Sequence, residues 1–378
     1  MPIPISGFDK ALDAIRHTKS LKTLGTRWDR QGSPEAFWKK FDAGEYNKAD
    51  SKVIVPKRKP NATRNDPAVK QWMKEGAPPP AVAPFDAKKA QEHQAAWAKY
   101  LGVPVEVTNA IGMKLVLIPP GEFDIGSPQE PIDEKLKTAP KDDKAYLERL
   151  PSEGPRHDVR ITRPFYLGMY LVTQEEYQRV MGTNPSDFSA TGYQKDIVAG
   201  QDTKRFPVEM VTWQDANEFC ARLSEMPEEK SAGRRYRLPS EAQWEYACRA
   251  GSTGRCFFSP ASDEKKAAEN LLPDYAWFKD NAGGRPHAVG GRRASAWGLY
   301  DIYGNVWEWC QDWYAKDYYA KSPADDPAGP AVGSNRVFRG GSWRDPARNC
   351  RSAYRNDQRP GIHYDAVGFR VSLVLAEE

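Results

Sequence analysis

The chain has 378 residues, with 55 Lys and Arg against 51 Asp and Glu, which gives a formal net charge of +4. That length is typical of one large domain or two small ones. A hydrophobic fraction of 39%, with 12 Trp, 17 Tyr and 14 Phe, excludes a wholly disordered chain. The longest apolar runs have only the length of a strand, which excludes a membrane-spanning helix. No apolar segment follows the first residues, so we expect a cytoplasmic protein.

Residues 1–84 are predicted to form an extended, basic, proline-rich N-terminal arm, with short helices near 8–17 and 34–42. This stretch contains ten prolines, and its first 80 residues carry 16 basic against 9 acidic side chains. Such an arm suits docking on a protein or another acidic partner. Nucleic acid is the less favoured partner, because no nucleic-acid-binding motif accompanies the arm's tryptophans.

A connecting helix is predicted over 85–102, between the arm and a body at 103–378. Asp86 has the residue type of an N-cap, and Gly102 stands where a helix usually ends. In the body, GMKLVLIPPGEFDIGS predicts two short strands around a Pro-Pro-Gly turn, and DVRITRPFYLGMYLVT predicts two more.

Three helices of the body are marked by their first residues. Thr173 with Glu176, and Ser240 with Gln243, have the spacing of capping boxes, and Thr212 is a further N-cap. The helix after Thr212 is expected to bury one face, made of Ala216, Phe219, Cys220 and Leu223. The last 130 residues are rich in Gly, Trp, Asn and Asp, which predicts long ordered loops held by internal hydrogen bonds or bound ions.

Seven sequence blocks lie in the order found in one known family. They are GMKLVLIPPGEFDIGS, EGPRHDVRITRPFYLGMYLVTQEEY, PVEMVTWQDANEFC, YRLPSEAQWEYACRAG, WGLYDIYGNVWEW, RVFRGGSW and GFRVSL. Residues 103–376 thereby resemble the formylglycine-generating enzymes, or sulfatase-modifying factors. The resemblance implies an α+β fold, an elaborated C-type-lectin-like domain with a small mixed sheet, few helices and much irregular loop.

The copper site of the formylglycine-generating enzymes is only half present. In those enzymes two cysteines bind Cu(I), and the copper site oxidises a substrate cysteine. The two cysteines lie two and seven residues after the aromatic of the GGS-aromatic motif. Here Trp343 is that aromatic, Cys350 matches the second cysteine, and Asp345 stands in place of the first. A carboxylate is a hard ligand that does not suit Cu(I), so copper is not expected.

A second sulfur would have to come from elsewhere in the chain. Cys310 is the candidate for it, although it is equally suited to a disulfide with Cys350 or to an unpaired place in the core. Ser342, in the GGS motif, is the remaining candidate catalytic residue. The iron-dependent sulfoxide synthases that share this scaffold are not matched, because the chain has five histidines and no His-x-x-x-His pair.

The family resemblance also implies a structural calcium site. Its ligands would be the Asp301 side chain, the backbone carbonyls of Gly304 and Val306, and the Glu308 carboxylate. Hard oxygen ligands in a tight, glycine-containing loop suit Ca²⁺. The alternative is an ordinary turn with an acidic rim.

The C-terminal segment RDPARNCRSAYRNDQRPGIHYDAVGF is a candidate binding surface. It resembles the variable surface of lectin-like proteins that are diversified by retroelements, and its Tyr, Arg and Asn side chains suit adaptable recognition. The candidate contact residues, for a protein or peptide ligand, are Trp343, Arg344, Asp345, Arg348, Asn349, Tyr354, Asn356, Asp357, His363, Tyr364 and Asp365.

Two further groups of residues are expected to be structural. Four tryptophans should form a core that organises the loops, and four arginines should pair with buried carboxylates. They are Trp307, Trp309, Trp313 and Trp343, and Arg339, Arg351, Arg355 and Arg370. The sequence therefore favours a binding or scaffold module without copper over an oxidase acting through Cys350, with a retroelement-diversified binding protein as a second alternative.

Overall fold

The computed structural model describes residues 76–139, 143–259 and 265–375. The chain divides into two units, Met1–Ala62 and Thr63–Glu378, and the described residues all belong to the second. Most of the predicted N-terminal arm, including its helices near 8–17 and 34–42, therefore lies outside the described residues.

The largest sheet is antiparallel and has the strand order β2-β3-β6-β12-β7. Its strands are β2 (Glu106–Thr108), β3 (Lys114–Ile118), β6 (Phe165–Gly168), β12 (Ser372–Val374) and β7 (Arg235–Arg237). The C-terminal strand β12 lies between β6 and β7, so the end of the described chain joins β7 to the rest of this sheet.

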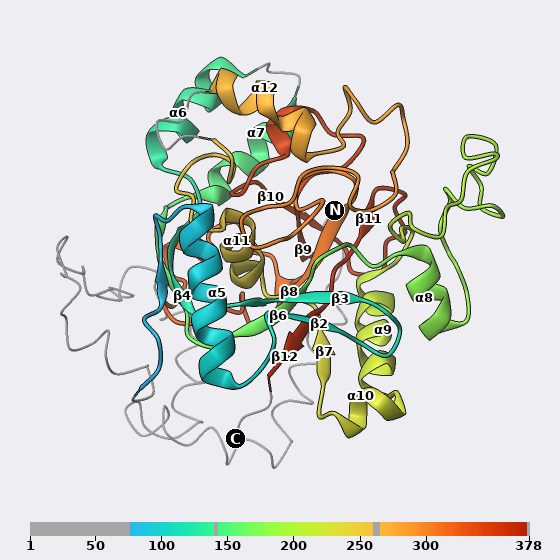
Figure 1. Ribbon diagram of the computed structural model, residues 1–378. Coiled ribbons are helices and arrows are strands. Elements are labelled where there is room, and N and C mark those ends of the chain that lie inside the picture. The colour runs from blue at the N-terminus through green and yellow to red at the C-terminus, as the bar shows by residue number, and fades with distance from the viewer. Residues whose placement is uncertain (1–75, 140–142, 260–264, 376–378) are drawn as a thin grey trace, which may run out of the picture. The chain divides into compact units, whose positions relative to one another are not determined.

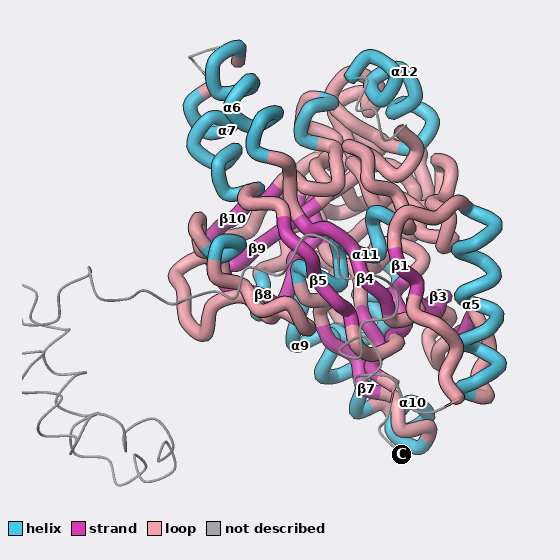
Figure 2. Tube along the Cα trace, turned by 90° about the vertical axis from the view of Figure 1, so that its left-hand side faces the viewer, coloured by secondary structure: helices cyan, strands magenta, loops and turns pink. Residues whose placement is uncertain are grey.

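A second sheet has the order β1-β4-β5. Its strands are β1 (Ala81–Val82), β4 (Gly121–Ile125) and β5 (His157–Ile161). β1 is parallel to β4 and β5 is antiparallel to it. Figure 2 shows the three strands side by side. The four strands predicted around the Pro-Pro-Gly turn and in the DVRITRPFYLG segment are confirmed as β3, β4, β5 and β6. The turn after β3 carries the chain from one sheet into the other.

The third sheet has the order β10-β9-β8-β11. It contains parts of the blocks WGLYDIYGNVWEW, RVFRGGSW and GFRVSL. Its strands are β8 (Trp307–Trp313), β9 (Arg336–Arg339), β10 (Arg355–Gln358) and β11 (Val367–Gly368). β11 is parallel to β8, while the other pairs are antiparallel. The predicted site residues lie partly in the loops around these strands and partly in the strands: Glu308 and Cys310 are in β8, and Asn356 and Asp357 are in β10.

Helix α5 (Ala87–Leu101) confirms the predicted start and end signals. Asp86 accepts a hydrogen bond from the Lys89 N–H, and Gly102 ends the helix with φ of 65°. The helix packs on the body: Gln94 Nε2 donates to the carbonyl of Leu117 in β3 at 2.9 Å. Figure 1 shows α5 lying across the edge of the largest sheet. Residues 76–102 are therefore joined to the body by a strand pair and by helix packing.

The three other predicted helices are confirmed with their caps. They are α8 (Gln174–Met181), α9 (Trp213–Glu225) and α11 (Glu241–Arg249), and all three begin with a complete capping box. The buried face of α9 consists of the four predicted residues. Every residue of α11 is buried, because this helix contacts β4, β5, β8 and β9 in the interior (Figure 1).

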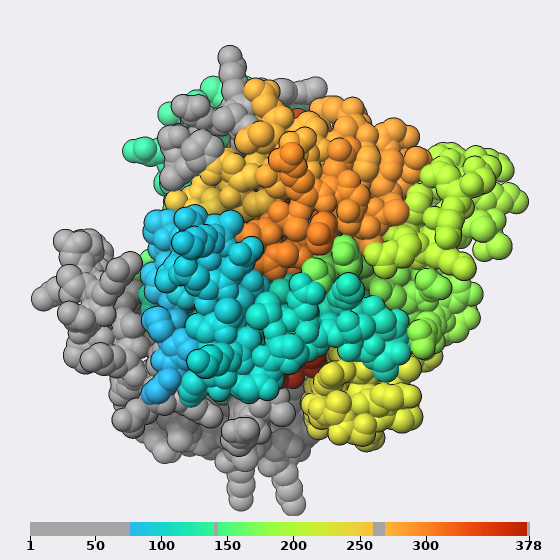
Figure 3. All heavy atoms as spheres, in the orientation of Figure 1, coloured from blue at the N-terminus to red at the C-terminus, as the bar shows by residue number. Residues whose placement is uncertain are grey.

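Further helices of the described residues lie in the connections. They are α6 (Gln129–Thr138), α7 (Lys144–Arg149), η2 (Leu150–Glu153), α10 (Pro227–Ser231), α12 (Lys265–Tyr275), η3 (Tyr318–Ala320) and η4 (Ala347–Asn349). The connection between α8 and α9 projects from the body on the right of Figure 3 and exposes Tyr193. Within the described residues, no helix is long and apolar enough to cross a bilayer.

The hydrophobic core forms two clusters, and the tryptophans lie where the loops meet the sheets. Trp307 and Trp309 of β8 pack edge to face on Phe338 of β9, with ring centroids 5.0 and 5.3 Å away. Trp307, Trp309 and Trp343 are buried in this core, while Trp313 is half-buried under the guanidinium of Arg336. This confirms the prediction that the tryptophans organise the loops.

Candidate functional site

Cys350 lies directly after η4, at the inner end of the loop that follows the GGSW motif. Its side chain is 1% exposed. Gly341 makes this packing feasible, because it has φ of 81° and a Cβ there would lie 2.7 Å from the Cys350 sulfur. Burial raises the pKa of the Cys350 thiol well above its ordinary value, and the nearby Asp345 carboxylate raises it further. The sulfur is therefore held as a thiol rather than as a reactive thiolate.

Access to Cys350 is closed as well. The crevice beside its side chain leaves no volume for a water molecule. It is lined by Arg255, Cys256, Glu269, Leu272, Ala347 and Cys350. A peptide or a dioxygen molecule would need this wall to open before it reached the sulfur.

Asp345 is tied into the loop by its side chain. One carboxylate oxygen accepts from Asn349 Nδ2 at 2.9 Å and the other accepts from Ser342 Oγ. The Asp345 N–H donates to the Ser342 carbonyl at 3.0 Å. Burial raises the pKa of Asp345, opposed by these hydrogen bonds. The residue that replaces the first copper cysteine thus holds the loop together, and Ser342 is buried as its partner.

Cys310 does not pair with Cys350. None of the five cysteines forms a disulfide. The Cys310 thiol lies 3.9 Å from the Glu308 carbonyl, among the charges of Asp312, Glu241 and Arg339. Of the two arrangements that the sequence left open for Cys310, the structure shows the unpaired thiol in the core.

The cysteine that the structure brings to Cys350 is Cys256, which sequence reasoning missed. The Cys256 sulfur lies 3.6 Å from the Cys350 carbonyl, and the two thiols act on each other electrostatically. The two residues are 94 positions apart in the chain. No local pattern marks the pair, since it depends on the loop after α11 meeting the loop after GGSW.

Three of the predicted binding-surface residues are buried. Trp343, Asn349 and Tyr354 are 7%, 9% and 3% exposed, so they are core residues and the surface prediction was wrong for them. Trp343 packs edge to face on Phe188, at 5.2 Å between ring centroids. Tyr354 packs on Trp307 at 5.9 Å. A loop-rich fold has little regular structure to form a core, so large aromatic side chains are buried in its interior.

Three other predicted residues lie at the surface but bind within the chain. Arg348 forms an ion pair with Asp143, just before α7. The Asp357 carboxylate accepts from Arg149 at 3.3 Å and from Asn335 at 2.6 Å. Asn356 accepts from the Asp357 N–H at 2.9 Å. These contacts fasten the C-terminal segment to its neighbours.

The remaining predicted residues form one exposed patch, which we call the Arg344 patch: Arg344, His363, Tyr364 and Asp365. Arg344 Nη1 pairs with Asp365 at 2.6 Å, and its guanidinium lies 5.6 Å from the Tyr364 ring. His363 contacts the Met210 carbonyl at 2.8 Å through Nδ1. Tyr364 is 38% exposed, so an aromatic ring and a cation are offered together to a ligand.

Glu209 lies buried under the Arg344 patch and was missed in the sequence. One of its oxygens accepts from the Phe188 N–H at 2.9 Å, while the other has no hydrogen-bond partner among the described residues. The pKa of Glu209 is raised to about 8, chiefly by burial and to a smaller extent by the charges of Asp187 and Asp365, against the lowering effect of backbone hydrogen bonds. At neutral pH this carboxyl is therefore protonated.

The predicted calcium loop is tightly folded around Asp301. The Asp301 carboxylate accepts from the Gly290 N–H at 2.7 Å, and burial raises its pKa to about 6. Gly304 has φ of 73°, and a Cβ there would lie 2.2 Å from the Trp277 carbonyl oxygen, which explains the glycine. A buried carboxylate with a raised pKa lacks a full counter-charge, and a cation would supply one.

The other predicted ligand, Glu308, already has a cationic partner. Its two oxygens accept from Arg370 at 2.6 and 2.8 Å, and Trp244 Nε1 donates to one of them at 2.9 Å. A calcium ion would have to share this carboxylate with Arg370, and it would share the Asp301 carboxylate with the Gly290 N–H and the Asn305 amide. In the part of the chain that the structure describes, no group of three or more His, Cys, Asp or Glu side chains is arranged to hold a metal ion.

The four arginines of the C-terminal blocks are structural, as predicted. Arg339 pairs with Glu241 and Glu245 of α11, and Arg355 also pairs with Glu241. Arg351 pairs with Glu153, and Arg370 with Glu308. All four guanidinium groups are buried, and they neutralise interior carboxylates.

The body matches a known family along nearly its full length. Residues 103–374 match the model of the sulfatase-modifying factor enzyme 1-like domain. A formylglycine-generating enzyme of Streptomyces coelicolor is 36% identical over 311 residues, which is 68% of this chain and 87% of that protein. Serine/threonine-protein kinase pkn1 of Chlamydia pneumoniae is 29% identical over 68% of this chain, but the match spans only 37% of the kinase.

Two solved structures have a similar fold. Treponema denticola variable protein 1 aligns with a TM-score of 0.56 and 28% identity, over 71% of this chain and 99% of that one. PvdO from Pseudomonas aeruginosa aligns with a TM-score of 0.55 and 29% identity, over 71% and 98%. These likenesses confirm the predicted α+β, C-type-lectin-like fold with few helices. The chain belongs to the sulfatase-modifying factor family.

Proposed function

We propose that this chain is a binding or scaffold module of its family that does not use copper. The observation that carries the proposal is Asp345. It stands where the resemblance implies the first copper cysteine, and its carboxylate is occupied by Ser342 and Asn349. A hard carboxylate that is already hydrogen-bonded is a poor ligand for Cu(I).

The state of Cys350 supports the same proposal. A buried thiol with a raised pKa and no open path to solvent is suited to packing, not to nucleophilic or redox chemistry. Cys310, the candidate for a second sulfur, lies on the α11 side of β8. Oxidation of a peptidyl cysteine through Cys350 remains the alternative function, and Cys256 would then be the nearby thiol.

The Arg344 patch is the proposed ligand-binding surface. An exposed tyrosine beside an arginine, rimmed by Asp365 and His363, has the chemistry of a protein or peptide recognition site. A second candidate, a sequence-diversified binding protein, is favoured by the similarity to the Treponema variable protein. We also propose that the basic residues 1–84 dock on a protein or another acidic partner.

The loop 301–308 is proposed to hold a structural calcium ion. Asp301, the carbonyls of Gly304 and Val306, and Glu308 would be its ligands. All four supply hard oxygens, and Asp301 lacks a full counter-charge. The ion would stabilise the loop that leads into β8 and would take no part in chemistry.

Incubation with a cysteine-containing peptide, copper and air tests the absence of catalysis. We expect no aldehyde on the peptide, as detected with an aminooxy probe, under conditions in which the Streptomyces coelicolor formylglycine-generating enzyme converts it. Aldehyde formation by the wild-type chain that is lost in Cys350→Ser would establish an oxidase and overturn the proposal.

A peptide array tests the binding role. We expect peptides that bind the wild-type protein to lose affinity for Tyr364→Ala and to keep it for Tyr193→Ala, the control. Tyr193 is also an exposed tyrosine, at 85%, but it lies on the projecting loop between α8 and α9. Equal binding by the wild type and Tyr364→Ala would remove the Arg344 patch as the binding surface.

A further inference from the structure

A small hollow lies between the end of β4, the loop after α11 and the segment after Cys350. Its volume is about 90 Å³, which is room for several water molecules or one compact anion. The charged side chains that line it are all basic: Lys135, Arg156, Arg249, Arg255 and Arg351. Among the described residues that line it, none is Asp or Glu.

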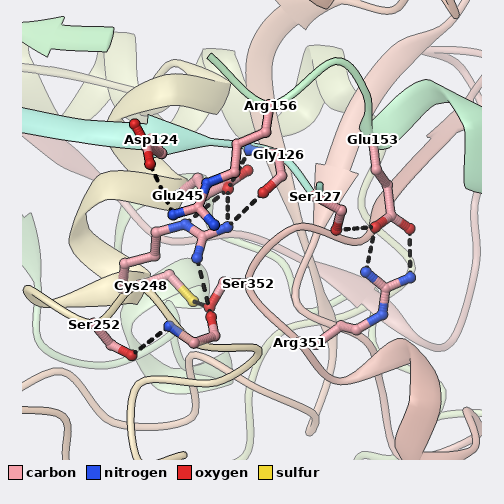
Figure 4. A network of polar contacts seen from close by, with 12 residues as sticks. Asp124, Gly126, Ser127, Glu153, Arg156, Glu245, Cys248, Ser252, Arg351 and Ser352 are labelled. Carbon is pink, nitrogen blue, oxygen red and sulfur yellow. Dashed lines mark hydrogen bonds and ion pairs between the residues drawn. The ribbon is translucent and has the colours of Figure 1, made fainter. Parts of the chain in front are cut away.

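Three of these cations have carboxylate partners that do not line the hollow. Arg249 pairs with Glu245 at 2.7 Å, Arg351 with Glu153, and Arg156 with Asp124 at 2.8 Å. Figure 4 shows Arg156 beside Asp124, and Arg351 held by Glu153. Glu245 is also shared with Arg339. Leaving Lys135 aside, four cations against three carboxylates, one of which is shared with Arg339, give the hollow a positive potential.

Arg255 is a further cation of the hollow, and its hydrogen bond goes to an uncharged acceptor. It donates to the Arg348 carbonyl at 3.5 Å. Its charge adds to the positive potential of the hollow, and it also reaches the crevice beside Cys350. A bound anion would therefore lie close to the loop that carries the proposed function.

The Nε–H of Arg156 is buried and has no hydrogen-bond partner among the described residues. Leaving a buried donor of a charged group unpaired is costly, so this group calls for an acceptor that the chain itself does not provide. Arg156 also lines the hollow. This donor is a second observation, independent of the count of charges, that points to an anionic ligand.

The walls of the hollow are held in place before any ligand arrives. Arg249 Nη2 donates to the Gly126 carbonyl at 2.9 Å and Nη1 donates to the Gly254 carbonyl at 3.1 Å, which joins two walls. Ser127 Oγ donates to Glu153 at 2.7 Å on the side of Arg351. A site with fixed walls binds without the cost of ordering its side chains.

We propose that this hollow binds one compact tetrahedral oxyanion, a phosphate or sulfate group. The cations come from four separate segments, namely α6, the residue before β5, the end of α11 with its loop, and the segment after Cys350. A tetrahedral group presents oxygens to all of these sides, whereas a carboxylate presents two oxygens to one side. Guanidinium groups suit such oxyanions because they offer paired, charge-assisted donors.

Isothermal titration of the full chain tests the proposal. Potassium phosphate, potassium sulfate and potassium chloride are titrated at matched ionic strength, because sulfate and phosphate also stabilise folded proteins without a site. We expect saturable binding of phosphate and sulfate at one site per chain, and none of chloride. Arg156→Gln should weaken the binding about tenfold or more, since it removes one charged partner of the anion.

Arg160→Gln is the matched control. Arg160 lies on β5 and pairs with Asp325, so the change removes an equally paired arginine away from the hollow. Lys135→Gln, in α6, is a second test variant in case Arg156→Gln fails to fold, as judged by its melting curve and circular dichroism. We expect Arg160→Gln to bind like the wild type and Lys135→Gln to bind more weakly.

A phosphoserine peptide and phenyl phosphate distinguish the source of the anion. Binding of inorganic phosphate alone would identify a free ion, and stronger binding of the monoesters would identify the head of a larger ligand. Both outcomes support the oxyanion site. Phosphate and sulfate that bind no better than chloride, or equal binding by the wild type, Arg156→Gln and Lys135→Gln, would overturn it.

Discussion

At the scale of single residues, the role of a polar side chain depends on the partner with which it forms hydrogen bonds or ion pairs. Asp345 was singled out in the sequence because a carboxylate replaces an implied copper ligand, and the structure shows it bonded to Ser342 and Asn349. Cys256 could not be found in that way. Its relation to Cys350 is made by two loops far apart in the chain, and no spacing rule connects them.

Glu209 is expected to make stability depend on pH. Its folded pKa is raised to about 8 from an ordinary value of 4.5, so between these two pH values the folded chain binds more protons than the unfolded chain. The stability that Glu209 contributes is therefore lost as the pH rises through this window, by on the order of 5 kcal/mol.

Glu209→Gln tests this directly. We expect urea unfolding at several pH values between about 5 and 8 to show that the unfolding free energy of the variant increases relative to that of the wild type as the pH rises. The Gln amide keeps the shape of the protonated carboxyl and cannot ionise. A difference in unfolding free energy that stays constant with pH would show that Glu209 does not titrate in the fold.

At the scale of elements, local signals in the sequence predicted the elements whose ends are marked by side chains. Helices α5, α8, α9 and α11 begin with N-caps and were predicted from them. Helices α6 and α12 were missed: α6 begins after Pro128 with no side-chain cap, and α12 contains Pro273. Four strands, β3 to β6, were predicted, but β1, β2 and β7 to β12 were not, and five of these lie in the stretch that was expected to form loops. The division of the strands among three sheets depends on contacts between distant segments.

Helix α11 carries the buried charges that hold the third sheet to the interior, and Glu241 is the residue to change. It accepts from Arg339 at 2.7 Å and from two nitrogens of Arg355 at 2.7 and 2.8 Å. Glu241→Gln leaves two buried guanidinium groups short of charge, so we expect a loss of about 3–5 kcal/mol of unfolding free energy.

Glu225→Gln is the control for that measurement. Glu225 also pairs with a cation, Lys230 at 2.5 Å, but both side chains are about two-thirds exposed. Its loss should leave the unfolding free energy nearly unchanged in the same urea titration. Equal effects of the two substitutions would contradict the view that the α11 ion pairs hold the fold.

The loop 301–308 should respond to calcium. We expect millimolar CaCl₂, but not MgCl₂, to raise the melting temperature of the wild type after treatment with a chelator, because a larger cation suits an irregular set of oxygens. Asp301→Ala should lose this response, since it removes the side-chain ligand. A wild-type melting temperature that calcium leaves unchanged would mean that Arg370 alone balances Glu308.

At the scale of the whole molecule, the family and the fold were predictable and the site was predictable only in part. Sequence blocks in register identified the scaffold, because they mark residues 103–374 from end to end. Of the predicted surface, the Arg344 patch is exposed, while Trp343, Asn349 and Tyr354 serve the core. Residue type alone could not separate these groups, since Tyr, Trp and Asn suit both a binding surface and a loop-rich interior.

The basic hollow shows the same limit. Its five cations are spread over more than 200 positions of the chain, and each of them taken alone is an ordinary charged side chain. Only the fold brings them around one volume. Scaffold and ligand chemistry are thus separate properties of this molecule, and the second has to be argued from its own residues.

An anaerobic Cu(I) titration against a competing chelator tests the central claim, that Asp345 removes the copper site. The proteins compared are the wild type, Cys350→Ser and Asp345→Cys. We expect weak and equal binding by the wild type and Cys350→Ser, and tight binding by Asp345→Cys, because two thiolates form the soft site that Cu(I) prefers. Tight binding by the wild type that is lost in Cys350→Ser would contradict the claim and make the chain a copper protein with an altered ligand set.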